Sequence, residues 1–140
     1  MPAPHFERLL DAIHQICRFT VAGIWFYQGL VPKLLGPHGD ELAMGLAFGL
    51  SPHMAQWASY GAGSAEIAFA LCLVVFHRQA WPQLISAIAM VGLLAFVVLY
   101  APAYLLAAFN PAVMNVAGCA LSVIGVLVIR ARKAQVAGAY

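Results

Sequence analysis

The sequence predicts an all-α fold, a polytopic membrane protein built as a four-transmembrane-helix bundle with a short interfacial helix between helices 1 and 2. Hydrophobic residues make up 64% of the 140-residue chain and charged residues 9%, with a mean hydropathy of +0.87. Soluble domains contain about 25% charged residues. The chain also holds apolar stretches of roughly 20 residues, long enough to cross a bilayer, separated by turn and cap residues. We therefore expect one membrane domain over residues 1–140.

The first span and the interfacial helix are predicted from the first half of the chain. The expected span, residues 16–35, ends at Gly36-Pro37, because proline cannot continue a helix and glycine tolerates the terminal turn. Residues 40–50 are apolar but too short to cross a membrane. We expect them to lie at the interface, with Asp40 as the helix N-cap.

Three further spans are expected, at residues 54–76, 82–100 and 111–129. Ser51 before Pro52 is a helix-start signal, because a capping residue is followed by proline at the first helical position. Asn110 before Pro111 repeats this signal. The two pairs are expected to open the second and fourth spans.

Lysine and arginine predict the orientation. The turn between spans two and three contains Arg78, and three basic residues follow span four. The connection between spans one and two contains one lysine and two acidic residues, and the connection between spans three and four contains no basic residue. By the positive-inside rule, both termini face the cytoplasm, and the composition is typical of a bacterial inner-membrane protein. The net charge of +2 forms no basic stripe, so we expect the lipid bilayer and not nucleic acid as a partner.

Glu66 is the one charged residue of the apolar run from residue 57 to residue 76. A charge at mid-membrane costs about 3 kcal/mol on insertion scales, so it requires a partner, a proton or a cavity. Small residues in the same four-residue rhythm let helices approach closely, namely Ala58, Ala62 and Ala70. We expect Glu66 to face the bundle, and its protonation state to depend on whether a lysine reaches it.

We predict a polar pocket around Glu66 and Lys33 in the outer half of the bundle. Side chains on a helix lean toward its N-terminus, so the two side chains would lean toward each other from adjacent spans. The expected lining residues are Gln28, Tyr100 and Asn115, and those expected at the mouth are Asp40, Glu41 and Asn110. His38 and His53 flank this mouth, but they are too far apart in sequence to predict a metal site.

Each residue of this pocket also has a structural interpretation. Glu66 could be a hydrogen-bonded strut between helices, and Lys33 a headgroup anchor. Asp40 and Asn110 could serve as helix caps. The sequence identifies no catalytic residue.

Residues 18–46 carry the most specific pattern of the chain, RFTVAGIWFYQGLVPKLLGPHGDELAMGL. Its marks are Trp25, the run Gly29-Leu30-Val31-Pro32-Lys33-Leu34 and the run Asp40-Glu41-Leu42. Further marks are Gly63 with Glu66, Pro102, and Asn110-Pro111 followed by Asn115. On these residues the chain resembles the DoxX-like family of four-span membrane proteins, over about residues 16–130.

The resemblance implies a four-helix membrane bundle. It also implies a quinone- or lipid-binding component of a membrane redox system, because the wider DoxX/DoxD group includes a subunit of thiosulfate:quinone oxidoreductase. In that role Glu66 would handle a proton and Lys33 would hold a ligand oxygen. The quinone enters through the resemblance alone, and no cofactor follows from the residues themselves.

Two other functions stay open at this point, and the sequence does not decide whether the protein is an enzyme. The chain shows no haem-ligand histidine pair, cysteine pair or nucleotide loop, so any electron donor would be an external redox partner. One alternative is a non-catalytic scaffold that assembles a membrane complex. The other is a proton-coupled carrier for a small hydrophobic compound.

Overall fold

The computed structural model describes residues 4–106 and 110–137, and the secondary structure within these ranges is entirely helical. The all-α class is as predicted. A π-helical turn, η1 (Leu30–Leu34), continues the first helix, and a 3₁₀ turn, η2 (Pro102–Leu106), follows the fourth. The five α-helices are α1 (Pro4–Gly29), α2 (Gly39–Ala47), α3 (Pro52–Val75), α4 (Trp81–Tyr100) and α5 (Pro111–Ala137).

Three of these helices, α3, α4 and α5, are long and apolar enough to cross a membrane, with mean hydropathies of 1.5, 2.3 and 2.3 in their most apolar windows. Their starts lie close to the starts predicted for the last three spans. The first helix is not in this group; its apolar part is interrupted by Gln15 and Arg18. Both α1 and α5 extend past the apolar stretches into polar sequence, since a helix need not end where a hydrophobic run does.

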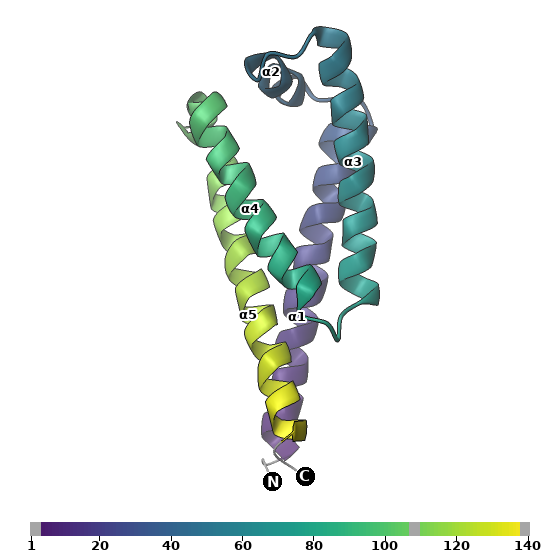
Figure 1. Cartoon of the computed structure of the whole chain (residues 1–140), viewed down its shortest axis with the longest axis vertical. Coiled ribbons are helices and arrows are strands. Elements are labelled where there is room, and N and C mark those ends of the chain that lie inside the picture. The colour runs from purple at the N-terminus through teal and green to yellow at the C-terminus, as the bar shows by residue number, and fades with distance from the viewer. Residues whose placement is uncertain (1–3, 107–109, 138–140) are drawn as a thin grey trace.

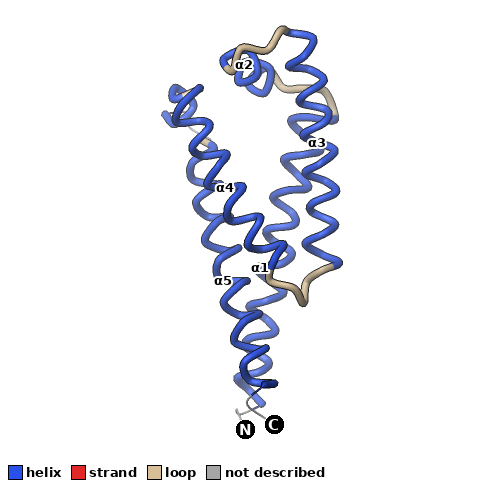
Figure 2. Tube along the Cα trace, in the orientation of Figure 1, coloured by secondary structure: helices blue, strands red, loops and turns tan. Residues whose placement is uncertain are grey.

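The helices form two pairs that diverge along the length of the molecule (Figure 1). The first pair is α1 with α3, the second is α4 with α5, and α1 also packs against α5. The pairs meet at the narrow end, where the first turns of α1 and the last turns of α5 lie together. They separate toward the wide end, where α2 lies across the space between α3 and the end of α4 (Figure 2).

Capping residues explain where the helices begin. Ser51 Oγ accepts a hydrogen bond from the backbone N–H of Met54 at 3.4 Å. Asn110 Oδ1 accepts one from the backbone N–H of Val113 at 3.1 Å. In both helices proline follows the cap, where its missing N–H costs nothing.

The predicted cap of α2 was wrong. His38 is the N-cap, and its Nδ1 accepts a hydrogen bond from the backbone N–H of Asp40 at 3.4 Å. The backbone is extended at His38 and helical from Gly39 onward, so the helix begins one residue before Asp40. Asp40 and Glu41 therefore lie in the first turn, where their charges complement the positive end of the helix dipole.

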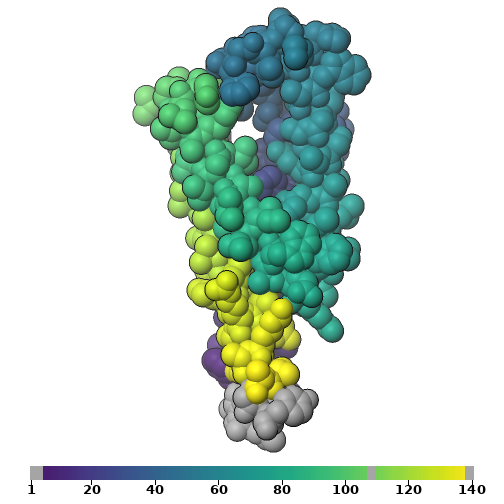
Figure 3. Space-filling view, in the orientation of Figure 1, coloured from purple at the N-terminus to yellow at the C-terminus, as the bar shows by residue number. Residues whose placement is uncertain are grey.

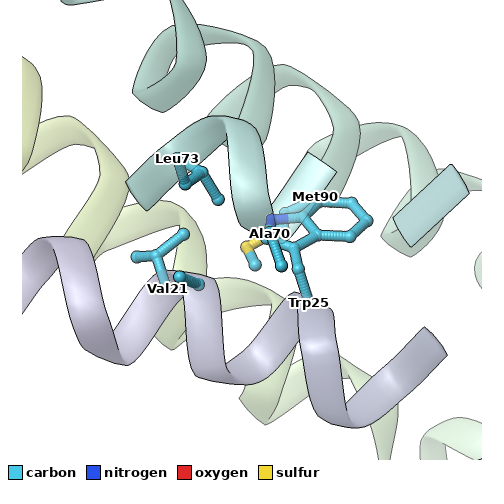
Figure 4. Packing of buried hydrophobic residues seen from close by; sticks show 6 residues of the cluster. Val21, Trp25, Ala70, Leu73 and Met90 are labelled. Atoms are coloured by element: carbon cyan, nitrogen blue, oxygen red, sulfur yellow. The ribbon is translucent and has the colours of Figure 1, made fainter. Parts of the chain in front are cut away.

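The hydrophobic core lies in the half of the molecule where the helix pairs converge. Its central residues are Val21, Trp25, Ala70, Leu73 and Met90 (Figure 4). All five are at most 7% exposed. They close the bundle below the divergent half, which leaves room for a cavity between the helix pairs.

Candidate functional site

The π-helical turn η1 positions Lys33. Pro32 has no backbone N–H and its ring clashes with the carbonyl four residues earlier, so an α-helix cannot continue through it without distortion. The turn widens instead, and the N–H of Leu35 donates to the carbonyl of Leu30, five residues back, at 2.9 Å. This turn holds the Lys33 side chain against α3, where the residue is 9% exposed. Single π-helical turns of this kind occur frequently at functional sites.

Two glycines bring α1 and α3 together beside this lysine. A Cβ atom on Gly63 would lie 2.7 Å from the carbonyl oxygen of Gly29 and 2.8 Å from Cβ of Lys33. No side chain fits in that space. The close crossing places Glu66, one turn after Gly63, opposite Lys33.

Lys33 forms an ion pair with Glu66 and lies beside a second carboxylate. The Nζ atom donates to Glu66 Oε1 at 2.9 Å and to Oε2 at 3.0 Å. Glu41 Oε1 on α2 is 3.5 Å from the same nitrogen. The side chains of Lys33, Glu66 and Glu41 are 11%, 12% and 18% exposed. Three elements, η1, α2 and α3, thus contribute one charged group each to a largely enclosed cluster, which we call the Lys33 cluster.

The Lys33 cluster forms part of the wall of a cavity of about 270 Å³ between the two helix pairs. Figure 3 shows the molecule hollowed between α2 and α3 on one side and the end of α4 on the other. Most of the lining is apolar, including Ile24, Trp25, Met44, Met90, Leu93, Phe96, Val97 and Met114. A mostly apolar cavity with a few convergent polar groups is the usual form of a small-molecule site.

Five of the eight residues predicted for the pocket line this cavity. Lys33 and Glu66 are joined as described, and Glu41 lies in the wall with them, although it was placed at the mouth. Gln28 on α1 and Asn115 on α5 also line the cavity. The Gln28 amide donates to the sulfur of Met114 at 3.1 Å, and Asn115 is 8% exposed.

The other three predicted residues do not line the cavity. Tyr100 packs against the rings of Phe48 and Phe96, with centroids 5.2 and 5.0 Å apart. Asp40 is exposed and accepts a hydrogen bond from the Tyr104 hydroxyl at 3.1 Å. Asn110 is used as the cap of α5. Tyr100 is therefore not part of the lining, because ring packing holds its side chain elsewhere, while a hydrogen bond to Tyr104 engages Asp40 and the cap of α5 engages Asn110.

The small residues of α3 have two kinds of surroundings. Those that are buried are Ala55, Ser59, Gly63 and Ala70. The predicted Ala58 and Ala62 line the cavity, on the same side of the helix as Glu66. Their small size keeps the space open beside Glu66.

Residues 22–123 match the sequence profile of the DoxX-like family. The chain belongs to the DoxX-like family. The match covers most of the chain and includes every lining residue of the cavity. No curated protein and no solved structure shows a significant match to the chain.

This DoxX-like protein is an integral membrane protein. Its membrane-length helices expose large apolar side chains, as at Ile88, Val91 and Leu99 on α4. Such faces contact the acyl chains of a bilayer. The charged residues of the Lys33 cluster face the cavity inside the same bundle.

A buried hydrogen-bonded group in the DoxX-like protein was missed by the sequence reasoning. Trp25 Nε1 donates to Ser86 Oγ at 2.8 Å, and Ser122 Oγ lies 2.9 Å from the same oxygen. These bonds join α1, α4 and α5 next to the cavity, since Trp25 also lines it. The only signal was a serine in each of two apolar helices, which does not specify a partner.

Proposed function

We propose that the cavity binds a lipid-soluble ligand of the quinone type and that the protein acts as a quinone- or lipid-binding component of a membrane redox system. One observation carries this proposal: the Lys33 cluster is a compact polar patch in the wall of an otherwise apolar cavity. Quinones combine the same two chemistries. They have an apolar ring and tail, and two oxygens that accept hydrogen bonds when oxidised and donate them when reduced.

The arrangement of donors and acceptors favours both redox forms of such a ring. The Lys33 ammonium already donates to Glu66, so the carboxylate oxygens are the groups left to accept a ligand hydroxyl. The amides of Gln28 on α1 and Asn115 on α5 also line the cavity and can donate to a carbonyl oxygen. In this proposal the reduced ring loses two protons and two electrons as it becomes the quinone. Glu66 takes one proton, Glu41, the second carboxylate of the cluster, takes the other, and the two electrons pass to a separate redox protein.

The proposal places the cavity in the outer half of a bacterial inner membrane. In this topology α1 with η1 forms the first of four spans and α2 lies at the outer interface. It is supported by the two ends of the described chain, which lie at the same end of the bundle (Figure 1). Basic residues gather there, namely Arg78, Arg130, Arg132 and Lys133, as the positive-inside rule expects of the cytoplasmic side.

Quinone binding can be measured through Trp25. The chain has three tryptophans, and Trp57 and Trp81 are 64% and 42% exposed. Replacing these two with phenylalanine leaves Trp25, in the cavity wall, as the only reporter. We expect a water-soluble ubiquinone analogue to quench its fluorescence saturably.

In the same background, Glu66→Gln should weaken binding about tenfold or more, since hydrogen bonds to charged groups contribute about 1.5–3 kcal/mol. Exposed Glu7 provides the control variant, Glu7→Gln, which should bind as the parent does.

A scaffold role is the second candidate, because the Lys33–Glu66 pair joins η1 to α3 at their close crossing. A purely structural pair predicts that Glu66→Gln lowers the unfolding temperature of the purified protein. It also predicts no saturable quenching of Trp25 by the ubiquinone analogue in any variant. That result would reject the quinone proposal.

A further inference from the structure

A second cavity, of about 510 Å³, lies near the narrow end of the bundle. Three parts of the chain form it: α1, the turn between α3 and α4, and the last turns of α5. Its charged and titratable lining residues are Asp11, His14, His77, Arg78, Arg132 and Lys133. We call it the basic pocket. Four of these six residues lie outside residues 22–123, the range that matches the DoxX-like family.

We propose that the basic pocket binds a phosphate group. Arg78, Arg132 and Lys133 line it against a single carboxylate, Asp11. That carboxylate is already paired with Arg132, at 2.8 Å between Oδ1 and NH1. The pocket therefore keeps an excess of positive charge that no described acidic residue of its lining neutralises.

The two histidines add directional groups to this charge. A nitrogen of the His14 ring, Nε2, lies 2.9 Å from the backbone carbonyl of His77 and must donate to it, because a carbonyl only accepts. The Nδ1 atom of His77 is buried and has no hydrogen-bond partner among the described residues. A buried ring nitrogen without a partner is costly. Because His77 forms part of the pocket wall, a rotation of its ring toward the pocket would bring this nitrogen to a bound anion.

The electrostatics of His14 are consistent with a site prepared for an anion. His14 lies two residues before the predicted first span, and its burial, followed by the nearby cations Arg132 and Arg18, lowers its pKa below the usual value despite the hydrogen bond to His77. A bound anion would oppose this effect of the cations.

Arginine suits a phosphate ligand, because the guanidinium fork donates two parallel hydrogen bonds to phosphate oxygens. Basic pockets between membrane helices on the cytoplasmic side are typical sites for anionic lipid headgroups. Two sources supply the same chemistry here: the headgroup of an anionic phospholipid, or a soluble phosphate. Exposed apolar residues close in sequence to the pocket, such as Phe76 and Trp81, offer a surface for the acyl chains of the first.

The test uses the full-length protein in a neutral detergent, with lipid binding measured by native mass spectrometry. Phosphatidylglycerol should bind at least tenfold more tightly than phosphatidylcholine, and salt should weaken it. Arg78→Gln and Lys133→Gln should each reduce binding about fivefold, the equivalent of about 1 kcal/mol per basic residue near an anionic surface. Arg130→Gln is the matched control, because Arg130 is exposed on the same helix but does not line the pocket. Asp11→Asn should tighten binding, since Asp11 is the only acidic residue of the lining within the described part of the chain.

Inorganic phosphate distinguishes the two sources. If millimolar phosphate displaces phosphatidylglycerol from the parent, and the displacement is lost in Arg78→Gln, the phosphate site holds and its occupant is soluble. If phosphatidylglycerol binding depends on Arg78 and Lys133 but resists phosphate, the occupant is a lipid. Equal binding of the two lipids with no effect of phosphate would overturn the proposal. So would a loss in Arg130→Gln as large as that in Arg78→Gln.

Discussion

The two cavities differ in whether carboxylates neutralise their cations. In the cavity at the wide end, the ammonium of Lys33 is almost enclosed and contacts two carboxylates. In the basic pocket, cations outnumber carboxylates and their side chains remain in contact with solvent, as for Arg132 and Asp11 at 44% and 55% exposed. In the wide-end cavity the adjacent carboxylates neutralise the one lysine, whereas in the basic pocket the cations outnumber the carboxylates.

This difference follows from the cost of removing charge from water. In a low-dielectric interior an unpaired charge costs several kcal/mol, so a lysine is retained there only with an acidic partner. At a bilayer surface water screens the charges, and a surplus of cations is tolerated. This difference is why we propose a neutral polar ligand for the wide-end cavity and an anion for the basic pocket.

The largest effect should come from breaking the buried pair. Lys33→Met leaves the carboxylates of Glu66 and Glu41 together in an apolar wall. We expect the protein to lose about 3–5 kcal/mol of stability, the usual cost of removing one partner of a buried ion pair. Unfolding in mixed detergent micelles with increasing dodecyl sulfate would measure this. Lys133→Met, at an exposed position, should change stability by less than about 0.5 kcal/mol. Equal effects of the two substitutions would show that the Lys33 cluster is not sheltered from water.

A smaller effect is expected from separating α1 and α3. Gly63→Ala would place a methyl group against the Gly29 carbonyl and Cβ of Lys33. Overpacking of this kind costs about 1–3 kcal/mol. A methyl group on the neighbouring Gly61 would meet no atom within 4 Å, so Gly61→Ala is the matched control and should be neutral or slightly stabilising. Intact stability of Gly63→Ala would mean that the crossing is looser than the glycines suggest.

Much of the fold was predictable because the signals that define membrane helices are local in sequence. Apolar length, Ser51-Pro52 and Asn110-Pro111 place the starts of α3 and α5 within the chain. The same rules misplaced the cap of α2, because an imidazole nitrogen at His38 replaced the expected carboxylate. They also missed the π-helical turn. Pro32 signals a disturbed helix, but whether that helix kinks, ends or widens depends on its packing against α3.

The site was predictable where the position of a residue along its helix decided the outcome. Lys33 and Glu66 meet because neighbouring helical segments bring them within reach of each other and two glycines allow the close approach. Tyr100 could not be excluded in the same way. Its ring has aromatic neighbours on α4 and at the end of α2. No periodic pattern in the sequence indicated how the segment between α1 and α3 folds. The basic pocket was also missed, since its residues come from three separate segments and its cations were interpreted as topology signals alone.

The smallest effect should come from the exposed ion pair of the basic pocket, and it sharpens the comparison most directly. Arg132 and Asp11 are 2.8 Å apart, as close as Lys33 and Glu66. Because their side chains are about half exposed, solvent screening should limit the coupling energy of this pair to about 0–1 kcal/mol. A double-mutant cycle with Asp11→Asn and Arg132→Gln would measure it, in the same unfolding assay and at low and high salt. We expect a small coupling that disappears at high salt. A coupling of several kcal/mol that survives salt would show that the basic pocket is buried in the membrane, and that the two regions do not differ in the way their exposed fractions indicate.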